Sequence, residues 1–139
     1  MIPEPGRDDS RLRTESGPTL LLVEDEDALR AAIRRLLQDE GYTVLEAQNG
    51  ASALQVLNAP GAHGIALVLT DLRMPVMDGR QLAAAVARLR PSLPVVFMSG
   101  FTAQLMDMRL VSPHLAFLAK PFSNDDLLAT VRGQLGRAL

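Results

Sequence analysis

Five polar residues, each placed directly after an apolar stretch, have side chains suited to divalent-metal and phosphoryl chemistry. They are Glu24, Asp25, Asp71, Ser99 and Lys120. If the apolar stretches are parallel strands of one sheet, these residues meet at its carboxyl edge, where open α/β sheets bind ligands. Three carboxylates there would attract a hard divalent cation, which prefers oxygen ligands. A hydroxyl group and an ammonium group beside them would bind phosphoryl oxygens.

The distribution of basic residues supports a special role for Lys120. It is the only lysine among the 14 basic residues of the chain, and the others are arginines. A compact ammonium group and a planar guanidinium group are not interchangeable at a phosphoryl site. An arginine-biased composition would also leave a single lysine by chance, so this observation only adds to the argument from position.

Length and composition exclude several classes of protein. The chain has 139 residues, 47% of them hydrophobic, which fits one domain with a core of its own. It has no cysteine, which excludes thiolate chemistry and fits a reducing cytoplasm. A net charge of −2 without basic clusters argues against nucleic-acid binding. No segment resembles a membrane span or a signal peptide, so we expect a cytoplasmic protein without membrane insertion.

Short apolar runs alternate with segments of helical periodicity from Thr19 onward. The expected strands cover 19–23, 43–47, 65–70, 94–99 and 115–119. The expected helices cover 27–40, 50–58, about 79–89 and 103–111, and a last one begins after Ser123. Strict alternation predicts an α/β fold, a doubly wound sheet of five parallel strands. Residues 1–18 are polar and rich in proline, so we expect a disordered leader or linker before a domain over 19–139.

Four separated segments, LLLVEDED, LVLTDLRMPVMDG, VVFMSGF and FLAKPF, resemble the receiver domain of bacterial two-component response regulators. They occur in the order found in that family, and the resemblance covers roughly residues 18–137. It implies a flavodoxin-like (βα)5 fold with strand order 2-1-3-4-5. The switch point of such a sheet lies between the first and third strands, where Asp25 and Asp71 would sit.

The resemblance also implies roles for the residues at this edge. Asp71 would be the phosphoacceptor, and Mg²⁺ would be bound by Asp25, Asp71 and the backbone carbonyl of Arg73. Glu24 would act on the metal through water. Lys120 and the Ser99 hydroxyl would bind phosphoryl oxygens, and no organic cofactor is expected.

Further positions are implied to govern switching and phosphoryl lifetime. Ser99 and Phe117 would change position on phosphorylation, although Phe117 fits an ordinary core residue equally well. Gly100 would leave room for a phosphodonor, while Arg73 and Phe101 would set access and lifetime. Neither of these two positions a hydrolytic water well, so we expect slow self-hydrolysis. The family resemblance also implies a cis peptide bond before Pro121.

The function implied is that of a phosphoacceptor switch, not a metabolic enzyme, although it assists its own phosphotransfer and autodephosphorylation. The phosphoryl group would come from a histidine kinase or a histidine phosphotransfer domain. A downstream protein would read the face formed by the fourth helix, fifth strand and fifth helix. The chain would be either a stand-alone regulator or the C-terminal receiver of a hybrid sensor kinase.

Two other functions fit the sequence less well. A degenerate receiver would bind partners without phosphorylation. Such a protein would be expected to lack the acid pair, Asp71 or Lys120, and all of these residues are present. A phosphohydrolase resembling the haloacid dehalogenases would need a second aspartate two residues after Asp71, and Arg73 stands there.

Overall fold

A parallel sheet of five strands forms the centre of the computed structural model, which describes residues 17–74, 76–99 and 115–138. The strand order is β2-β1-β3-β4-β5, with every neighbouring pair parallel, as the family resemblance implied. The strands are β1 (Thr19–Val23), β2 (Thr43–Ala47), β3 (Ile65–Asp71), β4 (Val95–Ser99) and β5 (Leu115–Ala119). All five predicted strands are confirmed to within one residue at each end.

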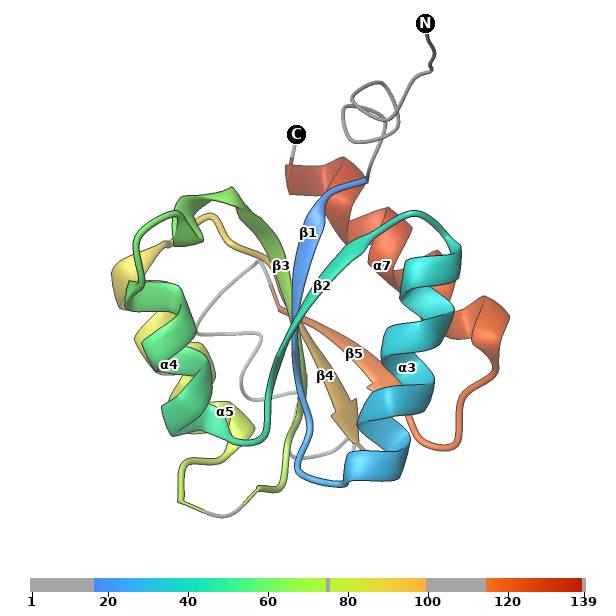
Figure 1. Ribbon diagram of the computed structural model, residues 1–139, viewed down its shortest axis with the longest axis horizontal. Helices are drawn as coiled ribbons and strands as arrows, with labels where there is room; N and C mark the ends of the chain where they lie inside the picture. Colours follow the sequence, from blue (N-terminus) through green and yellow to red (C-terminus); the bar gives the residue numbers. More distant parts are fainter. Residues whose placement is uncertain (1–16, 75, 100–114, 139) are drawn as a thin grey trace, which may run out of the picture.

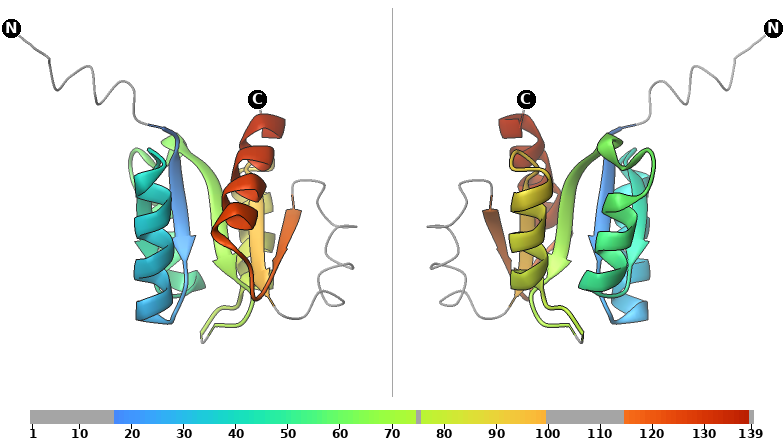
Figure 2. Two further views of the ribbon diagram at one scale, coloured as in Figure 1. Left: turned by 90° about the vertical axis from the view of Figure 1, so that its right-hand side faces the viewer. Right: turned by 90° about the vertical axis from the view of Figure 1, so that its left-hand side faces the viewer.

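Helices cover both faces of the sheet (Figures 1 and 2). One face carries α3 (Asp27–Asp39) and α7 (Asn124–Ala138), and the other carries α4 (Gly50–Asn58) and α5 (Gly79–Leu89). A short 3-10 turn, η1 (Ala62–Gly64), precedes β3. The predicted helix 103–111 lies outside the described residues, as does almost all of the predicted leader. Within the described ranges, each predicted helix is confirmed.

Strands β1, β3 and β4 are buried on both faces of the sheet, which explains why they read as continuous apolar runs. Alternate residues of β1 enter two separate cores: Leu21 and Val23 pack with α4 and α5, whereas Leu20 and Leu22 pack with α3 and α7. Each strand therefore ceases to be apolar where it leaves the sheet. The first polar residues after the strands are thereby placed at one edge.

Helix ends follow the predicted capping signals. Asp78 and Gln81 form a reciprocal capping box at the start of α5, with hydrogen bonds of 2.9 and 3.0 Å. The Ser123 hydroxyl accepts a 3.0 Å hydrogen bond from the backbone N–H of Asp126 at the start of α7. Gly41, in the left-handed region at φ +97°, ends α3. The first turn of α5 thus has a fixed place directly after the loop that follows β3.

Two further sequence expectations concern the backbone and the membrane. The Lys120–Pro121 peptide bond is cis, as expected. None of the helices in the described ranges is both long and apolar enough to cross a bilayer.

Candidate functional site

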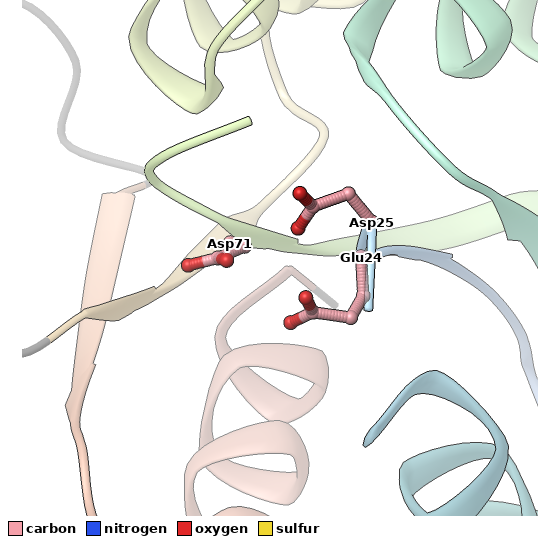
Figure 3. Close-up of side chains that lie close together, drawn as sticks. All are labelled: Glu24, Asp25 and Asp71. Carbon is pink, nitrogen blue, oxygen red and sulfur yellow. The ribbon is translucent and has the colours of Figure 1, made fainter. Parts of the chain in front are cut away.

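Three carboxylates converge at the carboxyl edge of the sheet (Figure 3). Glu24 and Asp25 directly follow β1, and Asp71 is the last residue of β3, the neighbouring strand. One carboxylate oxygen from each residue lies within 4.8 Å of the other two. Because β1 and β3 flank the switch point of the sheet, the predicted position of the acidic cluster is confirmed.

Backbone hydrogen bonds join the strand ends that carry these side chains. The N–H of Leu72 donates to the carbonyl of Met98 at 3.3 Å, and the N–H of Lys120 donates to the carbonyl of Ser99 at 3.0 Å. The N–H of Glu24 donates to the carbonyl of Ala47 at 3.1 Å. The backbone of the candidate site is therefore held in place by hydrogen bonds at the edge of the sheet.

Lys120 reaches two of the three carboxylates. Its Nζ lies 3.4 Å from Oδ1 of Asp71 and 3.8 Å from Oε1 of Glu24. The ammonium group thus lies at the same edge of the sheet, within reach of the candidate phosphoacceptor and of Glu24. Its side chain keeps 31% of its surface exposed, so it can turn toward an incoming anion.

Glu24 is almost fully buried, with only 1% of its surface exposed, whereas its neighbour Asp25 is exposed. Its Oε2 accepts a 3.0 Å hydrogen bond from the N–H of Glu26, but its buried Oε1 accepts none within the described residues. Burial raises the pKa of Glu24 to about 7; the N–H of Glu26 opposes the shift, the charge of Asp71 adds to it, and Lys120 opposes it.

Asp71 shows the same tendency. Burial raises the pKa of its carboxyl, the charge of Lys120 and its hydrogen bond oppose the shift, and the charge of Asp25 adds to it. Two unit charges about 5 Å apart repel by roughly 3–4 kcal/mol at an effective dielectric constant of about 20. Three carboxylates and one ammonium group carry a formal charge of −2, which a divalent cation would balance.

The donor set fits Mg²⁺. Every side-chain atom that the acidic cluster offers to a metal is an oxygen. The buried Oε1 of Glu24 accepts no hydrogen bond from the described residues. Mg²⁺ is usually bound through one or two carboxylates while it keeps several waters, and such a water could donate to a buried carboxylate oxygen. The residues present therefore suit a hydrated hard cation.

The remaining predicted residues are only partly within the described ranges. Ser99 is buried at the end of β4, and Arg73 is exposed two residues after Asp71. Phe117 is half-buried on β5 and stacks on the fully buried Phe97 of β4, with ring centroids 6.3 Å apart. Gly100 and Phe101 lie outside the described residues. The roles expected of these residues stay predictions.

A variant of Glu24 tests the electrostatics of the metal-free site. Because folding raises the pKa of Glu24 from 4.5 to about 7, the folded state binds this proton more tightly than the unfolded chain. Its stabilising contribution is full below pH 4.5 and is lost as the pH rises through about 7. Glu24→Gln should lose this dependence and gain roughly 1–3 kcal/mol of unfolding free energy at about pH 8.

Denaturant titrations in a chelating buffer across this pH range would measure the effect. Glu26→Gln, at an exposed carboxylate two residues further on, is the matched control and should follow the wild type. An unchanged pH dependence in Glu24→Gln would contradict the prediction.

Comparison with known proteins decides the family. The model of the response regulator receiver domain matches residues 20–132. The chain belongs to this family. It is 39% identical over 118 residues to the sensor kinase CckA of Brucella abortus, covering 84% of this chain. It is 35% identical over 117 residues to the response regulator receiver protein CpdR of the same organism, covering 84% of this chain and 95% of CpdR.

Solved receiver structures agree with this assignment. The receiver domain of the hybrid histidine kinase CckA aligns with a TM-score of 0.69 and 36% identity, covering 84% of this chain and 98% of that domain. A response regulator receiver protein from Sinorhizobium medicae aligns with a TM-score of 0.79 and 31% identity, covering 91% and 99%. The chain spans only 12% of the CckA kinase and 25% of the Escherichia coli regulator GlrR. It is thus a receiver domain of a two-component system, with an acidic pocket at its sheet edge.

Proposed function

We propose that this receiver accepts a phosphoryl group on Asp71 from a phosphohistidine partner, in a Mg²⁺-dependent reaction. The observation that carries the proposal is the convergence of the Asp71 carboxylate with the acid pair and with Lys120, whose Nζ lies 3.4 Å from Asp71 Oδ1. The donor would be a histidine kinase or a histidine phosphotransfer domain, and the setting the cytoplasm. Receivers are signalling switches, so the phosphorylated domain would act through a change in its conformation.

The transfer is a direct exchange of bonds at phosphorus. A carboxylate oxygen of Asp71 forms the new P–O bond as the P–N bond of the phosphohistidine breaks. The imidazole keeps the electron pair of the broken bond and takes a proton from solvent. Lys120 would pair with a phosphoryl oxygen, and the Ser99 hydroxyl would donate a hydrogen bond to another. The main contribution of the chain is therefore positioning and charge.

Asp25, Asp71 and the backbone carbonyl of Arg73 would hold Mg²⁺, with Glu24 acting through water. When bound, the ion neutralises charge on the phosphoryl oxygens. Two features support this assignment: the formal charge of −2 on the four ionisable groups, and the buried Oε1 of Glu24, which accepts no hydrogen bond from the residues that the structure describes. A bound divalent cation would also explain why three carboxylates lie together at this edge despite their mutual repulsion.

Switching is proposed to run through Ser99 and Phe117 to a downstream protein. That partner would bind the face formed by the predicted helix 103–111, β5 and α7. Gly100, Arg73 and Phe101 would govern access and phosphoryl lifetime, with slow self-hydrolysis. A phosphorylation-independent binding module is not favoured, because the acid pair, the phosphoacceptor and the lysine occupy one edge of the sheet.

Intact mass spectrometry after incubation with acetyl phosphate tests the function. We expect a gain of one phosphoryl group in Mg²⁺ and none in a chelating buffer, because without the cation two carboxylates repel the incoming anion. Alkaline hydroxylamine, which cleaves acyl phosphates, should remove the added mass. A gain that is independent of divalent ions, or resistant to hydroxylamine, would contradict the proposal.

A further inference from the structure

The acid pair lies in a short connection that belongs to neither a strand nor a helix. β1 ends at Val23 and α3 begins at Asp27, so Glu24 and Asp25 lie between the two elements. The sheet fixes the start of the connection, where the N–H of Glu24 donates to the carbonyl of Ala47. Asp25, one residue further on, is exposed. The orientation of the peptide that joins the two acids is therefore not set by the hydrogen bonds of either element.

Arg30, in the first turn of α3, contacts this peptide directly. Its Nη1 donates a 2.9 Å hydrogen bond to the carbonyl oxygen of Glu24. That carbonyl belongs to the peptide unit that leads to Asp25, and a peptide unit is planar and contains the Cα atoms of both residues. A hydrogen bond that fixes the carbonyl thus fixes the plane from which the Asp25 side chain starts.

Two carboxylates hold the guanidinium group of Arg30 in place. Its Nε donates to Oε1 of Glu46 at 3.1 Å, and its Nη2 donates to Oδ1 of Asp27 at 2.8 Å. Each of its three nitrogens therefore has a different partner: one on β2, one on α3 and one in the connection after β1. A guanidinium group presents its donors in a rigid planar fork, so three such contacts determine a single orientation. The side chain is only 18% exposed.

These contacts add orientation without adding net positive charge beside the site. Nη1 of Arg34 donates to the second carboxylate oxygen of Glu46 at 3.0 Å, so two guanidinium groups face two carboxylates. Their formal charges cancel, and a cation that enters the acidic cluster meets no net repulsion from them. Ion pairs that are partly open to solvent contribute little to folding. The hydrogen bond from Arg30 to the Glu24 carbonyl is the contact that links this group to the acid pair.

We propose that Arg30 is a positioning residue for the Mg²⁺ site. It orients the peptide between Glu24 and Asp25 and thereby keeps the Asp25 carboxylate beside that of Asp71. This inference rests on the proposed function, because it concerns the ion assigned to the same carboxylates. Arg30 acts through the backbone of the acid pair, without contacting the ion or the phosphoryl group. Residues that orient metal ligands in this way account for roughly 10–100-fold of metal affinity.

Magnesium titrations of the folded protein, followed by amide chemical shifts in NMR spectra, test the proposal. Arg30→Met keeps the aliphatic part of the side chain but has no hydrogen-bond donor. Its dissociation constant for Mg²⁺ should be roughly tenfold that of the wild type. Loss of a positive charge alone would act in the opposite direction, because it strengthens the attraction of the acidic cluster for a divalent cation. The sign of the change therefore separates positioning from charge.

Arg34→Met is the matched control. It removes the same charge and the same kind of group from the same helix, yet it leaves all three hydrogen bonds of Arg30 in place. Its dissociation constant should stay within about twofold of the wild-type value or fall below it. Arg30→Lys keeps the charge and a flexible donor, so it should recover part of the affinity that Arg30→Met loses.

The surroundings of Arg30 favour a folded variant. Its side chain borders a pocket of about 340 Å³ that is also lined by Glu46, Gln48 and Ser52 and is open to solvent, so truncation widens an existing hollow. Because the dissociation constants come from the folded protein, a loss of stability alone does not change them. If the amide spectrum of Arg30→Met is that of an unfolded chain, Arg30→Gln takes its place with the same expected direction.

The contrary outcomes are distinguishable. Mg²⁺ binding by Arg30→Met that equals or exceeds that of the wild type would overturn the positioning role and leave the proposed function standing. Equal weakening in Arg30→Met and Arg34→Met would show that the ion pairs act on the helix as a whole, which also overturns the role. Failure of the wild type to bind Mg²⁺ would overturn the metal assignment of the proposed function itself.

Discussion

Asp71→Asn is expected to take up no phosphoryl group from any donor and yet to fold at least as stably as the wild type. An amide oxygen is too weak a nucleophile to form a stable bond to phosphorus, while the size and shape of the side chain are kept. The substitution also removes one of three negative charges that lie within 4.8 Å of one another. In the absence of divalent ions it should therefore relieve repulsion and unfold at a higher denaturant concentration than the wild type.

Intact mass and denaturant titration on the same sample would measure both effects. Asp25→Asn is the matched control: it removes a charge from the same cluster but leaves Asp71 able to attack. It should keep slow, weakly metal-dependent uptake of the phosphoryl group. Phosphorylation of Asp71→Asn at the wild-type rate would place the acceptor elsewhere and refute the assignment.

The carboxyl edge of the sheet could be predicted from sequence because of how its strands are buried. β1, β3 and β4 are covered on both faces, so their apolar runs end where the chain leaves the core, as at Asp71. Strand β2 could be predicted from the sequence for another reason. It lies at the edge of the sheet and is mostly exposed, but its Thr-Val-Leu segment has strand propensity and follows a glycine stop.

Other features of the site depend on tertiary packing that no local pattern records. Glu24 and Asp25 follow the same strand and look alike in the sequence, yet one is buried and the other exposed. The difference arises from what covers each side of the strand end, including Lys120, which is distant in sequence. Val76 likewise has a φ of +72° in the loop that a hydrogen bond between Gly50 and Met77 attaches to α4, and nothing in the sequence around it signals this conformation.

Gly79→Ala is expected to destabilise the fold by about 2–4 kcal/mol, because the added methyl group has no space. A Cβ at this position would lie 2.6 Å from the carbonyl oxygen of Asp71 and 3.0 Å from Cα of Leu72. Both are backbone atoms, so no change of rotamer can relieve the contact. Either the first turn of α5 or the end of β3 must move.

The same clash should also impair the site, because its nearest atom belongs to Asp71 itself. Denaturant titration would give the loss of stability, and uptake from acetyl phosphate, measured well below the unfolding transition, should be slowed. Gly133→Ala in α7 is the matched control, since a Cβ there meets nothing within 4 Å. Alanine in a helix interior is favoured over glycine by roughly 0.5–1 kcal/mol, so this variant should be more stable than the wild type. Equal stability of the two variants would show that α5 does not pack against the phosphoacceptor strand as closely as described.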